Sequence, residues 1–146
     1  MAPRQFIFFL NWAAEFHKDL RQFYERKGRE ALSPEVEILL QYLSRHESTL
    51  AEIIEAYAED APPEILDAWF KVAPDLRAVK RPSDLEFGPD ATAEEVIDKA
   101  LEMDECLIVV YQMLIRQAVP ERLREVLQDL VSQEQREEIR LLKSRR

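Results

Sequence analysis

The chain has 146 residues, with 29 acidic and 20 basic side chains and a formal net charge of −9. That charge argues against nucleic acid or an anionic membrane as the main partner, because both attract basic proteins. Two glycines and one cysteine exclude glycine-rich phosphate loops, a disulfide framework and zinc sites built from several cysteines. Apolar residues make up 47% of the chain, enough to predict a single folded domain over residues 1–146.

The only compact apolar stretch near the start is Phe6–Leu10. It is too short to span a bilayer, and no cleavage pattern of small residues follows it. Together with the single thiol, this predicts a cytoplasmic protein with no membrane partner.

Four segments carry apolar residues at helical spacing, over about residues 3–28, 34–60, 93–118 and 120–144. Ser33-Pro34-Glu35 is typical of a helix start, with an N-cap, a proline and an acid in the first turn. Thr92 and Glu95 have the spacing of a capping box. These signals fix where the second and third helices begin.

Residues 61–92 differ from the rest, because they hold five prolines and a glycine. Only Ile65–Val72 could form a short helix there. The order is therefore a helical hairpin, a long connection and a second hairpin, which predicts an all-α four-helix bundle with one long crossover.

The two predicted hairpins repeat each other at an offset of 87 residues, which matches Tyr24 with Tyr111 and Glu47 with Glu134. A repeat of this kind indicates two copies of one hairpin packed about a pseudo-two-fold axis. An acidic helical adaptor without such symmetry is the weaker alternative.

The inward apolar stripe of each predicted helix is interrupted near its middle by ionisable residues. In chain order these are His17, Glu47, Asp104, and the pair Glu134 and Glu137. Mid-helix positions lie at one level of an antiparallel bundle, so we expect these five side chains to converge on one buried spot.

Four carboxylates in an apolar core cannot all ionise without a counter-charge. A divalent metal such as iron, manganese or zinc could supply it. Arg21, one turn beyond His17 on the same face, could reach in instead. The acids could also stay protonated and bond to the hydroxyls of Tyr24 or Tyr111, and a protonated His17 facing an acid needs no metal.

These residues resemble the ferritin-like superfamily, most closely its rubrerythrin-like branch. In that family helices one and three each give a Glu, and helices two and four each give Glu-x-x-His, to hold two metal ions. The resemblance covers about Phe6 to Ile54 and Ile97 to Leu141, without the crossover.

The family pattern is only partly kept. Glu47 and Glu134 match the first positions of the two Glu-x-x-His motifs, and Asp104 stands where helix three has Glu. His17 stands where helix one has Glu. Leu50 and Glu137 replace the two motif histidines, and Leu50 removes a ligand outright.

The resemblance implies a metal-binding, di-metal carboxylate protein that reacts ferrous iron with oxygen or peroxide. Its metal ligands would be His17, Glu47, Asp104, Glu134 and Glu137, with Tyr24, Tyr111 and Arg21 behind them. The chain has no Cys-x-x-Cys module, so a reductant would be a separate protein. The alternative is a non-catalytic ferritin-like bundle that has lost its metals and acts as a structural or interaction module.

Two further features bear on the surface. His46 points about 100° away from the stripe of its helix, so we expect it on the flank and outside the site. The first helix carries more aromatic residues than one stripe needs, and either the crossover with Trp69 and Phe70 covers them or they form a dimer face. We expect a homodimer.

Overall fold

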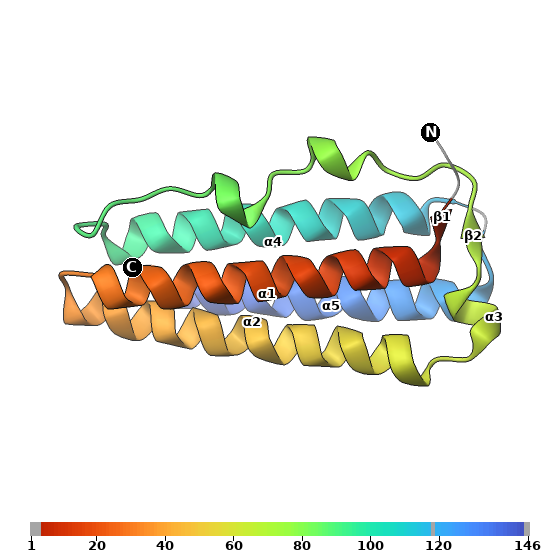
Figure 1. Cartoon of the computed structure of the whole chain (residues 1–146), viewed down its shortest axis with the longest axis horizontal. Helices are drawn as coiled ribbons and strands as arrows, with labels where there is room; N and C mark the ends of the chain where they lie inside the picture. Colours follow the sequence, from red (N-terminus) through yellow and green to blue (C-terminus); the bar gives the residue numbers. More distant parts are fainter. Residues whose placement is uncertain (1–3, 118, 145–146) are drawn as a thin grey trace.

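The computed structural model describes residues 4–117 and 119–144. Four long helices lie side by side (Figure 1): α1 Phe6–Glu30, α2 Pro34–Asp60, α4 Ala93–Ile115 and α5 Glu121–Ser144. The hairpin of α1 and α2 packs against the hairpin of α4 and α5. The predicted all-α bundle of two hairpins is confirmed.

The helix boundaries follow local signals in the sequence. The Glu95 N–H donates to Thr92 Oγ1 at 3.1 Å and the Thr92 N–H to Glu95 Oε1 at 3.4 Å, which closes the predicted capping box of α4. Ser33 is the N-cap of α2, and its carbonyl accepts from the Glu37 N–H at 3.0 Å.

Two predicted helix ends differ from those of the structure or cannot be compared with it. The expected start at Pro3 and the expected end at Ala118 lie outside the described residues. Within them, α1 begins at Phe6 because Arg4 and Gln5 form strand β1, and α4 ends at Ile115.

The crossover leaves α2 at one end of the bundle and runs back along its length to start α4 at the other end (Figure 1). It carries α3 (Pro63–Leu66), β2 (Trp69–Phe70) and the 3-10 turns η1 (Leu76–Ala78) and η2 (Pro82–Asp84). The helix predicted over Ile65–Val72 is wrong in extent. Strand β1 offers free backbone groups, so residues 69–70 pair with it (Arg4 with Phe70, Gln5 with Trp69) instead of continuing the helix.

The crossover also covers part of the aromatic surface of α1. The Phe70 ring meets Phe6 and Phe9 edge to face, at centroid distances of 6.2 and 5.6 Å. Both α1 rings are buried, whereas Phe8 stays 42% exposed. Cover by the crossover therefore accounts for Phe6 and Phe9, and Phe8 still faces outward.

The predicted stripes form the core of the bundle. Every stripe residue is buried except Tyr57, which is half-buried. The stripes are Phe6, Leu10, Ala13, His17, Leu20 and Tyr24; Val36, Leu40, Leu43, Glu47, Leu50, Ile54 and Tyr57; Ile97, Ala100, Asp104, Leu107, Tyr111 and Leu114; and Leu123, Leu127, Leu130, Glu134, Glu137 and Leu141. The interrupting ionisable residues therefore lie inside the bundle among leucines. Across the part of the chain that the structure describes, no helix combines the length and apolar character needed to cross a membrane.

Candidate functional site

The structure buries all five ionisable residues that the sequence singles out. His17 comes from α1, Glu47 from α2, Asp104 from α4, and Glu134 and Glu137 from α5, and none is more than 4% exposed. The charges of the other four act on the Asp104 carboxyl. All four long helices thus contribute to one buried polar cluster.

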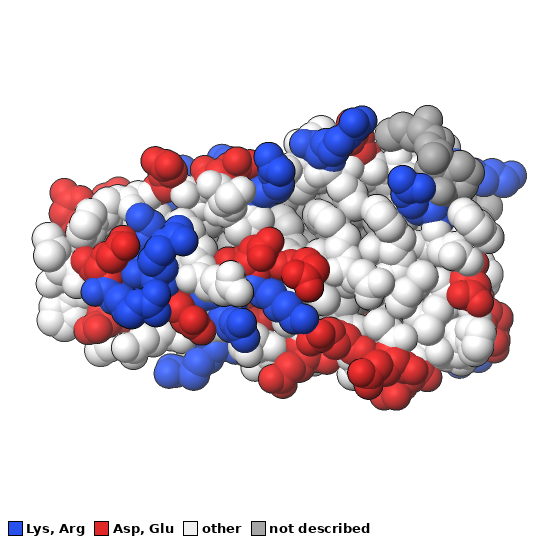
Figure 2. Space-filling model, viewed as in Figure 1, with Lys and Arg blue, Asp and Glu red and all other residues white. Residues whose placement is uncertain are grey.

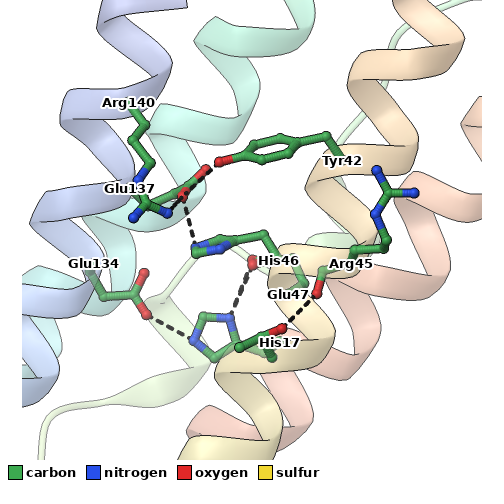
Figure 3. Close-up of polar contacts among 9 residues, drawn as sticks. His17, Tyr42, Arg45, His46, Glu47, Glu134, Glu137 and Arg140 are labelled. Atoms are coloured by element: carbon green, nitrogen blue, oxygen red, sulfur yellow. Dashed lines mark hydrogen bonds and ion pairs between the residues drawn. The ribbon is translucent and has the colours of Figure 1, made fainter.

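At the centre of this cluster the His17 ring lies between two carboxylates (Figure 3). Its Nδ1 is 3.2 and 3.3 Å from the two carboxylate oxygens of Glu47. Its Nε2 is 2.9 Å from Glu134 Oε1. Among the described residues Nε2 makes no hydrogen bond, so it is the two carboxylates on either side of the ring that favour its imidazolium form.

The electrostatics of His17 agree with that form. Burial lowers the pKa of His17 and is the largest single effect, but the two carboxylates together outweigh it, so its pKa is raised well above 6.5. Burial raises the pKa of Glu47, and the His17 charge opposes that rise. The His17 cation and the Glu47 carboxylate therefore stabilise each other's charged forms.

Asp104 forms no ion pair with any described residue, although the His17 charge acts on it. Burial raises its pKa well above the ordinary value, and the charges of Glu134 and Glu47 raise it further. Its Oδ2 is buried and has no hydrogen-bond partner among the described residues. The surroundings of Asp104 therefore favour its neutral, protonated form.

Both tyrosines are buried beside the cluster, and burial raises the pKa of each well above 10. They remain neutral phenols. The Tyr111 hydroxyl, however, has no hydrogen-bond partner among the described residues, so the expected bond from Tyr111 to the acids is not made. The charges of Glu47 and Asp104 act on Tyr24.

Glu137 is contacted from α2 by a residue that the sequence prediction left out. His46 Nε2 lies 2.9 Å from Glu137 Oε2, and the side chain of His46 is only 17% exposed. The Tyr42 hydroxyl donates to the same oxygen at 3.4 Å, and Arg140 Nη1 lies 3.9 Å away (Figure 3). The prediction that His46 lies outside the site is wrong.

The reason is that a helix flank faces a neighbouring helix as well as solvent. A residue 100° from the central stripe of α2 can point toward α5, where His46 meets Glu137. The Tyr42 ring stacks on His46, with planes 8° apart and centroids 6.3 Å apart. The sequence places Glu137 on the buried stripe of its helix, and a buried acid needs a polar or basic neighbour. That need was the one indication in the sequence that His46 could turn toward Glu137.

Arg21 is not the buried counter-charge. Its side chain is 37% exposed, and its Nε lies 3.8 Å from Glu25 Oε1, one turn further along α1. Ser44 also donates to that glutamate oxygen, at 3.3 Å. Arg21 stays at the surface because Glu25 is the nearer acid. His17 supplies the buried positive charge that Arg21 was expected to supply.

The side chains have the oxygen and nitrogen donors that iron, manganese or zinc accept, so their fit to a metal can be tested. Among residues 4–117 and 119–144, no three His, Cys, Asp or Glu side chains are placed to hold one ion. For His17 to ligate a metal, one of its nitrogens must present a lone pair to the ion, and both nitrogens face carboxylates. In this arrangement the residues do not form a metal centre.

Comparison with known proteins addresses the fold. No family model and no curated protein matches the chain. Among solved structures, the chain is similar to a Thermotoga maritima protein provisionally described as a ferritin-like diiron-carboxylate protein. The TM-score is 0.65 at 19% identity, over 98% of this chain and 95% of that one. The fold is ferritin-like. At 19% identity this similarity establishes the fold of the bundle. The chemistry of the site has to be argued from its own residues.

Proposed function

We propose that this ferritin-like bundle works without metal, as a structural or interaction module whose buried acids are balanced by protons and by its own cationic side chains. The position of the His17 ring between Glu47 and Glu134 carries the proposal. These are the two acids that match the family's motif positions, and an imidazolium stands between them.

Each buried acid then has its own means of balance. Glu47 and Glu134 share the single charge of His17, and a proton on Glu47, whose pKa burial raises, balances the second acid. Glu137 faces His46 and Arg140. Asp104, whose pKa burial raises, stays neutral. Nothing in this scheme needs a bound ion, and the absence of the first motif histidine at Leu50 is explained.

A balanced cluster of this kind supports a structural role. Buried ion pairs add little net stability, but breaking one is costly, and buried polar groups can fix how helices pair. The His17 contacts tie α1 to both α2 and α5, so they favour one rotation and register of the helices. In this role the ferritin-like bundle would serve as a rigid scaffold that presents its surface to other molecules.

A second candidate is a carboxylate site for iron, manganese or zinc, held by His17, Glu47, Asp104, Glu134 and Glu137. It is favoured by three buried oxygens that find no hydrogen-bond partner in the described part of the chain: Asp104 Oδ2, Glu134 Oε2 and Glu137 Oε1. The description of the Thermotoga maritima protein points the same way. Such a site would supply reaction of ferrous iron with oxygen or peroxide. His17 would have to release a proton before it could ligate, and a separate protein would have to deliver electrons.

Metal content separates the two candidates. The protein is purified without chelator or histidine tag, loaded anaerobically with ferrous iron, desalted and measured by elemental mass spectrometry. We expect well below one equivalent of iron, manganese or zinc per chain, before and after loading.

One or two equivalents that disappear in the Glu47→Gln, Glu134→Gln variant would overturn the proposal in favour of the metal site. Glutamine keeps the shape of the side chain while removing its charge. The matched control is Glu52→Gln, Glu59→Gln, which removes two exposed acids of α2 and should change the metal content only if iron adheres to the surface.

A further inference from the structure

A small hollow opens between α2 and α5, beside the pair formed by His46 and Glu137. Its volume is about 160 Å³, and one water molecule takes about 30 Å³ in the liquid, so it has room for a small ligand. Gln133, Arg136, Glu137 and Arg140 of α5 line it, opposite His46 of α2. We name this space the α2–α5 hollow.

The buried acid of the α2–α5 hollow has one oxygen to spare. Glu137 Oε2 faces the Nε2 of His46, the Tyr42 hydroxyl and Nη1 of Arg140 (Figure 3). Its Oε1 is buried and has no hydrogen-bond partner among the described residues. A buried acceptor without a donor destabilises the folded chain, so Oε1 is suited to a donor that a ligand brings.

Two arginines of the α2–α5 hollow have N–H groups to spare. Arg136 and Arg140 stand one turn apart on α5. Arg136 forms no ion pair or hydrogen bond with any other described residue, and neither does the side chain of Gln133. Within the same part of the chain, the single ion pair of Arg140 is the 3.9 Å contact of its Nη1 with Glu137. The hollow therefore offers free donors to a ligand that accepts.

The α2–α5 hollow is basic, although the protein is acidic. The chain has a net charge of −9, and Figure 2 shows acidic side chains gathered over the second half of α2, where the exposed acids include Glu52, Glu55, Glu59 and Asp60. Among the described residues that line the hollow, two arginines stand against one acid. This local reversal of sign favours an anion as the ligand.

Inorganic phosphate matches both the arginines and the spare carboxylate oxygen. A carboxylate ligand has two oxygens, which one guanidinium can occupy. Phosphate has four, so it can accept from Arg136 and Arg140 together. At pH 7 it also keeps at least one proton, and that hydroxyl can donate to Glu137 Oε1. Sulfate has no proton at this pH, so it would meet the Glu137 carboxylate with like charge and no hydrogen bond.

We propose that the α2–α5 hollow binds inorganic phosphate. Arg136 and Arg140 hold its anionic oxygens, and Glu137 Oε1 accepts a hydrogen bond from its hydroxyl. The inference deepens the interaction role proposed above, and it rests on that role because Glu137 can accept from phosphate only while no metal occupies its spare oxygen. Bound phosphate would add a link between the two helices that the hollow separates.

Isothermal titration calorimetry at pH 7, in low-salt buffer without phosphate, tests the proposal. Inorganic phosphate should bind about 10-fold or more tightly than sulfate, because it alone makes the charge-assisted hydrogen bond to Glu137. Methyl phosphate should resemble sulfate, since a phosphate monoester has a second pKa of about 6 and has mostly lost its proton at pH 7. The titrated protein is the desalted chain whose metal content has been measured. Metal content then judges the proposed function, and phosphate binding to the metal-free chain judges this inference.

Substitutions locate the bound phosphate. Arg136→Gln should weaken phosphate binding by about 10-fold or more, whereas Arg122→Gln, which removes an exposed arginine of α5 outside the hollow, should leave it unchanged. Glu137→Gln should remove the preference for phosphate over sulfate, because the glutamine amide can donate to either anion. Circular dichroism confirms that each variant is folded, and Arg136 is exposed, so its substitution keeps the test available if Glu137→Gln unfolds the chain.

Four outcomes would overturn the proposal. The metal-free chain could fail to bind phosphate at millimolar concentration, or bind it only after loading with ferrous iron. Phosphate and sulfate could bind equally, which would show an adventitious ion only. Arg122→Gln could weaken binding as much as Arg136→Gln. Glycine could bind where phosphate does not, in which case the arginines and Glu137 hold a zwitterion.

Discussion

Replacing His17 with leucine is expected to destabilise the fold by about 3–5 kcal/mol at pH 7, the usual effect of removing one partner of a buried ion pair. The substitution leaves Glu47 and Glu134 facing each other in the core, both less than 4% exposed, without the cation between them. Urea unfolding followed by circular dichroism gives the change in the free energy of unfolding.

The same region should tolerate removal of all its charges. The triple variant His17→Leu, Glu47→Leu, Glu134→Leu removes the uncompensated acids, so it should regain most of the lost stability or exceed the unaltered protein. Lys18→Ala is the matched control, since the Lys18–Glu55 pair joins α1 to α2 at the surface with 2.8 Å between charged atoms. Its loss should leave the free energy of unfolding almost unchanged, because the pair is exposed to solvent. A triple variant less stable than His17→Leu would contradict this account.

The cost of His17→Leu should also depend on pH, with a sign that follows from the pKa shifts. The pKa of His17 is raised in the folded protein. Its contribution is therefore fully present below pH 6.5 and is lost as the pH rises through the raised value. In the variant, Glu47, whose pKa already lies above 4.5, can relieve the repulsion by taking up a proton. The penalty should shrink as the pH falls from 7 toward 4.5, and a penalty that grows toward low pH would contradict the assignment.

Phe70→Ala is the second substitution with a large expected effect, a loss of about 3–5 kcal/mol. Phe70 is 1% exposed and joins the crossover to α1 through its contacts with Phe6 and Phe9. Its backbone also pairs with Arg4 in the two-stranded ladder. Without the ring, a cavity opens under the crossover and the ladder loses its packing.

Two measurements check the effect of Phe70→Ala. Urea unfolding gives the stability, and limited proteolysis under native conditions should cut residues 61–92 faster than in the unaltered protein. Val72→Ala removes an apolar side chain that is 56% exposed nearby, and it should change stability by about 0.5 kcal/mol or less. A loss for Phe70→Ala no larger than that of Val72→Ala would show that the ring does not hold the crossover in place.

The long helices could be predicted from the sequence because their signals are local. Apolar residues at a spacing of three and four define the buried face, and Thr92 with Glu95 sets the start of α4 within a few residues. The crossover could not be predicted in detail. Residues 69–70 become a strand because Arg4 and Gln5, more than sixty residues earlier, lie beside them.

The candidate site was also predicted only in part: which residues are buried could be predicted, but which atoms meet could not. Burial of His17, Glu47, Asp104, Glu134 and Glu137 follows from their positions on the stripes. Which atoms meet depends on the rotation of each helix about its axis, which periodicity does not give to within one side chain.

Flank residues of the site were therefore predicted less well than its centre. His46 pairs with Glu137 across two helices, whereas Arg21 finds Glu25 at the surface. Tyr111 lies at its expected depth without the expected hydrogen bond. In each case the outcome depends on a neighbour that only the packed bundle supplies.

The protonation state of His17 tests the central claim most directly. Histidine labelled with ¹⁵N gives ring signals from only two residues, His17 and His46, and the His17→Leu variant assigns them. At pH 8 we predict that both ring nitrogens of His17 carry protons and show imidazolium chemical shifts, unchanged when ferrous iron is added anaerobically. A neutral His17 ring with one unprotonated nitrogen at pH 8, or a His17 signal lost on adding iron, would contradict the account of a core balanced without metal.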